Sequence, residues 1–139
     1  MWSSQQTEAK FFGAFEHSLD LKGRITLPAK FRARFPERCF VARSQYGDPC
    51  LALWIPEDFY DYASKITADQ WTDNENRRDL RTWSREAFEV EMDKLGRLAV
   101  PLQLRRYASL TKDVLVHGAM GTVELWDPLV WSNYQGETK

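Results

Sequence analysis

Residues 15–32 read FEHSLDLKGRITLPAKFR, and residues 88–105 read FEVEMDKLGRLAVPLQLR. The two segments lie 73 positions apart and are identical at Phe15/Phe88, Glu16/Glu89, Asp20/Asp93, Gly23/Gly96, Arg24/Arg97, Pro28/Pro101 and Arg32/Arg105. Further along the chain, LWIP at residues 53–56 is matched by LWDP at residues 125–128, now 72 positions apart. The chain therefore contains an internal duplication, and the shift of one position indicates a deletion in a loop.

Each copy shows the same succession of patterns. Apolar Phe88, Val90 and Met92 alternate with Glu89 and Glu91, which is typical of a half-buried strand. Residues 93–96 interrupt the alternation, as a tight turn ending in glycine does. A proline then opens a short helix, where its missing N–H costs nothing. The patterns predict strands at 12–19, 24–27, 39–43 and 51–55 and helices at 28–35 and 56–66, then strands at 88–92, 97–100, 114–117 and 122–126 and helices at 102–108 and 128–134.

These elements predict an organisation in two related halves. We expect an N-terminal extension at residues 1–11, a first half at 12–59, a helical linker at 60–84 and a second half at 85–135. A half of about 50 residues is too small to close a core alone. The fold predicted is therefore α+β, with two pseudo-symmetric ββαββα halves fused into one β-barrel-like body with peripheral helices. Trp71 and Trp83 of the linker are expected to pack against this body, or else to form a protein-binding surface.

Composition excludes several classes of protein. The 139 residues include 43% hydrophobic and 28% charged residues, which excludes wholesale disorder. No apolar run approaches the roughly 20 residues that cross a bilayer, and the first residues lack the apolar centre of a signal peptide. We expect a cytoplasmic protein with no membrane partner. The net charge is only −1, yet residues 20–43 carry a net +5 and residues 57–92 a net −5, so one face can be basic.

Catalytic motifs are missing from the sequence. The only histidines are His17, which we expect to be a core side chain, and His117, for which no serine or cysteine partner is evident. Cys39 and Cys50 form neither a CxxC site nor a disulfide framework and are expected to be small core residues. There is no phosphate-binding glycine loop and no metal-ligand spacing. We expect neither an enzyme, a cofactor, a metal nor a small-molecule substrate.

The repeated Asp-x-x-Gly-Arg motif carries the functional prediction. Its aspartate can accept backbone N–H groups of the turn and pair with the arginine four residues on. Asp20, Gly23, Asp93 and Gly96 are therefore predicted to support the turns. Lys22 and Arg24 would then project from a rigid hairpin, and a two-stranded ribbon fits the major groove of DNA, where Arg and Lys donate to guanine.

The duplicated motif, with its trailing proline and Leu-Trp, resembles the MraZ family of bacterial proteins with two fused SpoVT-AbrB-type halves. The resemblance rests on residues 12–32, 90–98 and 124–127. It implies a transcriptional regulator of the division and cell-wall gene cluster that binds upstream tandem direct repeats of double-stranded DNA. It also implies nucleoid association and a ring-shaped homo-oligomer. Lys22 and Arg24 become the main DNA-binding residues and Lys94 and Arg97 secondary ones, because Leu95 stands where the first copy has Lys22.

A different class of function remains open. The protein could be a nucleoid-associated or protein-binding scaffold, for example an antitoxin-like partner, without gene-specific regulation. A regulator should shift a DNA fragment that carries its own upstream repeats, and a scaffold that binds only protein should not. Linked sites on a ring would gain about 10²–10⁴ in apparent affinity.

Overall fold

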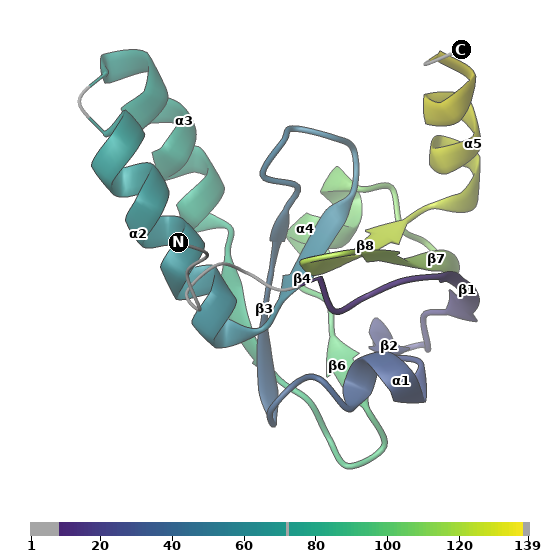
Figure 1. The fold of residues 1–139 in the computed structure, drawn as a ribbon. Helices are drawn as coiled ribbons and strands as arrows, with labels where there is room; N and C mark the ends of the chain where they lie inside the picture. Colours follow the sequence, from purple (N-terminus) through teal and green to yellow (C-terminus); the bar gives the residue numbers. More distant parts are fainter. Residues whose placement is uncertain (1–8, 72, 138–139) are drawn as a thin grey trace.

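The computed structural model describes residues 9–71 and 73–137, which form an α+β fold (Figure 1). The first copy contains β1 (Ala14–Ser18), β2 (Arg24–Thr26), α1 (Ala29–Arg32), β3 (Arg38–Arg43), β4 (Leu51–Trp54) and α2 (Pro56–Gln70). After α3 (Asn74–Arg85), the second contains β5 (Phe88–Glu91), β6 (Arg97–Ala99), α4 (Leu102–Tyr107), β7 (Asp113–Ala119), β8 (Thr122–Trp126) and α5 (Pro128–Glu137). The predicted order of elements is confirmed, although α2 runs through the position expected to divide the first half from the linker.

The two copies share one large antiparallel sheet with the strand order β1-β7-β8-β4-β3-β5. Its centre joins equivalent strands, with Leu51 of β4 opposite Leu125 of β8. The first strand of each copy pairs with the third strand of the other, β1 with β7 and β5 with β3. Backbone hydrogen bonds therefore run mainly between the copies, which explains why about 50 residues suffice for each.

A separate two-stranded sheet pairs β2 with β6, with Arg24 opposite Ala99, Ile25 opposite Leu98 and Thr26 opposite Arg97. Two predictions are wrong here. β1 and β2 do not form a hairpin, because β1 pairs with β7 and β2 with β6. Nor do the described strands close into a barrel, because β1 and β5 end the large sheet as open edges. The pseudo-symmetry of the halves stays a prediction.

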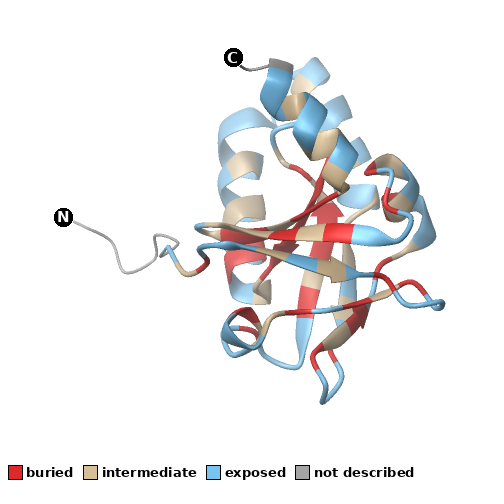
Figure 2. Ribbon diagram, turned by 90° about the vertical axis from the view of Figure 1, so that its right-hand side faces the viewer, coloured by how far each residue is buried: buried red, intermediate tan, exposed pale blue. Residues whose placement is uncertain are grey.

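The core is built from both copies and lies between the two sheets (Figure 2). Ile25 and Leu98, the middle residues of β2 and β6, are fully buried in it. Phe11 is also fully buried, with its ring stacked on Phe35 at 5.4 Å between centroids and edge-on to Phe31 at 5.5 Å. Part of the predicted N-terminal extension thus belongs to the core, while residues 1–8 lie outside the described part of the chain.

The helices α2 and α3 lie side by side at one end of the molecule (Figure 1). Trp83 of α3 stacks on Phe59 at 5.3 Å and donates its indole N–H to the carbonyl oxygen of Arg43 at 2.9 Å. Trp71 does not pack as predicted: it follows the last turn of α2, stays 38% exposed and lies under the Arg81 guanidinium. None of the described helices has the length and apolar content needed to cross a membrane.

Candidate nucleic-acid interface

The first Asp-x-x-Gly-Arg turn links β1 to β2 and is held by the carboxylate of Asp20. Its Oδ1 accepts the backbone N–H groups of Lys22 and Arg24, each at 2.9 Å. Its Oδ2 accepts the Nε–H of Arg24 at 2.7 Å. These donors, above all the Arg24 backbone N–H, lower the pKa of Asp20 from 3.8 to about 2. Gly23 completes the turn with φ +76°, a conformation that other residues rarely adopt.

The second turn repeats this geometry between β5 and β6. Asp93 Oδ1 accepts the N–H groups of Leu95 and Arg97 at 2.9 Å, and Oδ2 accepts the Nε–H of Arg97 at 2.7 Å. The pKa of Asp93 is lowered, chiefly by the Arg97 backbone N–H, and Gly96 has φ +80°. Both turns therefore share the same aspartate hydrogen bonds and the same positive φ at glycine, and the turn-supporting role of these aspartates and glycines stays a prediction.

The turns present cations to solvent. Lys22 and Lys94 are exposed, and the side chains of Arg24 and Arg97 are 30% and 34% exposed. Each ion pair uses Nε, the inner nitrogen of the guanidinium, so that the terminal nitrogens Nη1 and Nη2 keep their donors for another acceptor. The aspartate thus fixes the orientation of the arginine without covering its outer end.

The β2–β6 ribbon places both arginines on one face. Directly opposite residues point to the same side of a sheet, and successive residues alternate. Ile25 and Leu98 are buried in the core and lie opposite each other. Their neighbours Arg24 and Arg97 therefore both lie on the outward face of the ribbon. The arginine Cα atoms are two residues apart along the ribbon and one strand apart across it, roughly 8 Å. The structure thus brings together the two motifs that the sequence keeps 73 positions apart.

Sequence reasoning missed one feature of the two Asp-x-x-Gly-Arg turns, which we call the tips. Leu21 is fully exposed, and Leu95 is 61% exposed. Each turn therefore carries one leucine and one lysine in its middle, in the order Leu21-Lys22 in the first and Lys94-Leu95 in the second. Position-by-position alignment paired Lys22 with Leu95 and so hid the equal composition of the two tips.

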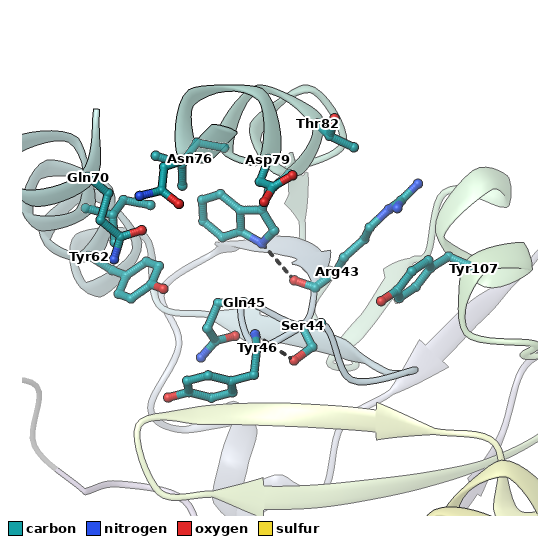
Figure 3. A pocket seen from close by; sticks show the side chains of 14 residues that line it. Arg43, Ser44, Gln45, Tyr46, Tyr62, Gln70, Asn76, Asp79, Thr82 and Tyr107 are labelled. Atoms are coloured by element: carbon teal, nitrogen blue, oxygen red, sulfur yellow. Dashed lines mark hydrogen bonds between the residues drawn. The ribbon is translucent and has the colours of Figure 1, made fainter. Parts of the chain in front are cut away.

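A pocket of about 670 Å³ lies between α2, α3 and the loop after β3 (Figure 3). The sequence did not predict it. At its rim Arg43 forms a two-pronged ion pair with Glu86, with contacts of 2.8 and 2.9 Å, and stacks over Tyr107. Because the charge of Arg43 is neutralised locally, this pocket is a weaker candidate for nucleic-acid contact than the turns.

The remaining candidate residues show no catalytic arrangement. His17 is half-buried on β1 and does not lie in the core as expected, because even the inner side of this edge strand, which it shares with Phe15, is only partly covered. His117 packs edge-on against Trp131, and burial lowers its pKa. Cys39 and Cys50 are buried free thiols, as expected, and burial raises the pKa of Cys39 to about 12. No group of three or more potential metal ligands occurs among the described residues.

The fold and the paired turns define a class: duplicated α+β proteins that display two copies of one turn motif on a shared ribbon. Two comparisons identify the family. The family model described as "MraZ protein, putative antitoxin-like" matches residues 11–82 and 84–139. The transcriptional regulator MraZ of Acetivibrio thermocellus is 37% identical over 127 residues, which cover 91% of this chain and 87% of the relative. The chain belongs to the MraZ family, as its resemblance predicted, and this family membership agrees with the expectation that it is not an enzyme.

Proposed function

We propose that this protein is a DNA-binding transcriptional regulator that contacts double-stranded DNA through Lys22, Arg24, Lys94 and Arg97. The observation that carries the proposal is the placement of Arg24 and Arg97 on one outward ribbon face, each tethered by its own aspartate. A pre-oriented guanidinium loses little conformational freedom when it binds. Its terminal nitrogens can donate to guanine O6 and N7 in the major groove or to a phosphate.

The charge of each turn indicates why a single subunit binds weakly. Asp20 offsets one of the two cations Lys22 and Arg24, so the first turn has a net charge of only +1, and the second turn is the same. Few phosphates are neutralised by such a tip, and affinity rises with the number neutralised. Strong binding therefore requires many tips that act together.

We propose that a ring-shaped homo-oligomer supplies these tips and binds tandem direct repeats upstream of the division and cell-wall gene cluster, in the cytoplasm and at the nucleoid. Family membership supports this arrangement. Exposed apolar side chains support self-association: Met120, which forms a β-bridge with Phe11, is 60% exposed, and Phe12 next to that bridge is 55% exposed. Simultaneous engagement of several tips would raise apparent affinity about 10²–10⁴-fold.

The test is a fluorescence-anisotropy titration of a duplex from the region upstream of the protein's own gene. Arg24→Ala should weaken binding by about 1–3 kcal/mol per contact, roughly 5–150-fold for each engaged tip. Arg78→Ala, at an exposed position of α3, is the matched control and should bind like the wild type. Equal affinities of Arg24→Ala and Arg78→Ala would contradict the proposal.

Two further measurements separate the finer parts of the proposal. An unrelated duplex should bind more weakly than the upstream duplex; equal affinity would favour a nucleoid scaffold without gene specificity. Light scattering with and without the upstream duplex should give a mass of many subunits in both cases. A monomer mass in both would contradict the ring.

A further inference from the structure

Arg32 and Arg105 are a pair of identical, charged residues of the duplication to which the proposed interface gives no role. Arg32 is the last residue of α1, and Arg105 lies in α4. Both side chains are half-buried. Their helices follow β2 and β6, the strands that each turn leads into, and each arginine reaches the turn of the other copy.

Arg105 lies against the first turn. A Cβ atom added to Gly23 would be only 2.7 Å from Cζ of Arg105 and 2.9 Å from Nη2, so the guanidinium occupies the space that a side chain would fill. Its Nε–H donates to the carbonyl oxygen of Val100 at 2.9 Å. The N–H of Val100 in turn donates to the carbonyl oxygen of Gly23 at 3.0 Å. Arg105 is thereby anchored to the backbone segment that holds the first turn.

Arg32 takes the reciprocal position on the second turn. A Cβ atom added to Gly96 would be 3.1 Å from Nη1 of Arg32 and in closer contact with its stem. The carbonyl oxygen of Gly96 accepts the N–H of Leu27 at 3.0 Å, as that of Gly23 accepts Val100. Each turn is therefore packed by an arginine from the other copy, and a glycine at both positions makes room for it.

We propose that Arg105 and Arg32 complete the DNA-contacting tips of the opposite copy, each by donating from its terminal nitrogens to a DNA phosphate. This inference rests on the proposed DNA-binding function. Arg105 raises the net charge at the first turn from +1 to +2, because it joins Lys22 and Arg24 beside a single aspartate. Its Nε is already bound to Val100, so the outer end of the guanidinium is fixed at the tip. Arg32 likewise raises the net charge at the second turn from +1 to +2, because it joins Lys94 and Arg97 beside a single aspartate.

The experiment measures how binding to the upstream duplex depends on salt, since each phosphate contact contributes about −0.9 to the slope of log K against log salt. Arg105→Gln keeps a stem over Gly23 but loses the charge, and should make the slope shallower by about 0.9 for each engaged tip. Arg105→Lys should keep the wild-type slope. Arg106→Ala is the matched control, because Arg106 is the exposed neighbour on the same helix. It should leave both slope and affinity unchanged.

The outcomes distinguish this inference from the proposed function. If Arg24→Ala weakens binding but Arg105→Gln keeps the wild-type slope, the phosphate contact of Arg105 is refuted and the proposed function stands. If Arg106→Ala changes the slope as much as Arg105→Gln, the effect is not specific to the tip and the inference is again refuted. If Arg24→Ala binds like the wild type, the proposed function itself fails. Far-ultraviolet circular dichroism confirms that Arg105→Gln is folded, and should it unfold, the slope of Arg32→Gln decides the question in the same way for the second turn.

Discussion

Replacing Gly23 by alanine tests the contact between the first turn and Arg105 of the second copy, through a measurement of folding stability that needs no DNA. Gly23 and Gly47 both have positive φ, +76° and +80°, so alanine at either position meets the same backbone strain of about 1–2 kcal/mol. No atom lies within 4 Å of a Cβ at Gly47, whereas the Arg105 guanidinium blocks the Cβ at Gly23. Because the end of an arginine side chain can shift, this crowding adds an amount at the lower end of overpacking costs, about 1 kcal/mol. We expect Gly47→Ala to destabilise by about 1–2 kcal/mol and Gly23→Ala by about 2–3 kcal/mol.

A double-mutant cycle identifies the source of the difference. In an Arg105→Ala background the obstruction is gone, so Gly23→Ala should cost no more than Gly47→Ala, a coupling of about 1 kcal/mol. Urea-induced unfolding of the wild type, the three single variants and the double variant gives these values. An identical cost of Gly23→Ala with and without Arg105 would refute the packing of Arg105 on the first turn.

Three other predictions follow from named contacts. The pKa of Asp20 is lower in the folded protein, about 2, than in the unfolded chain, near 3.8, so the ionised carboxylate stabilises the fold fully above pH 3.8 and this contribution is lost as pH falls through about 2. The difference in melting temperature between wild type and Asp20→Asn should therefore shrink over about three pH units, from pH 5 to pH 2. A difference that stays constant over this range would contradict the prediction. Leu98→Ala removes a side chain that is 1% exposed and should lower the free energy of unfolding, measured with urea, by about 2–5 kcal/mol. Leu129→Ala, at an exposed position, should lower it by less than about 0.5 kcal/mol. Similar losses would show that the ribbon does not close the core. Trp83→Phe loses the hydrogen bond to the Arg43 carbonyl oxygen and should lower folding stability by about 1 kcal/mol. Trp71→Phe should leave the thermal stability unchanged. Equal effects of the two substitutions in thermal melting would contradict the different burial of the two rings.

The turns could be predicted from the sequence because their causes are local. Asp20 and Arg24 are four residues apart, and Gly23 lies between them, so the hydrogen bonds and the positive φ are set within one short segment. Alternation likewise gave the inward and outward positions of the strands, such as Val90 between Glu89 and Glu91.

Strand partners could not be predicted in the same way. Alternation fixes which face of a strand is buried and leaves open which strand lies beside it. The pairing of β2 with β6, and the contact of Arg105 with Gly23, join segments far apart in the chain. Trp71 and Trp83 look alike in the linker sequence, and only the path of α2 and α3 decides that Trp83 reaches Phe59 while Trp71 meets Arg81.

Site-directed photo-crosslinking tests most directly whether the turns touch DNA. Cys39 and Cys50 are buried, so a thiol-reactive aryl azide should label a cysteine introduced at an exposed position. Labelled Lys22→Cys and Lys94→Cys should crosslink to the upstream duplex on illumination, and labelled Lys65→Cys, on the exposed side of α2, should not. Crosslinks from position 65 together with none from positions 22 and 94 would contradict the assignment of the DNA-binding surface to the two turns.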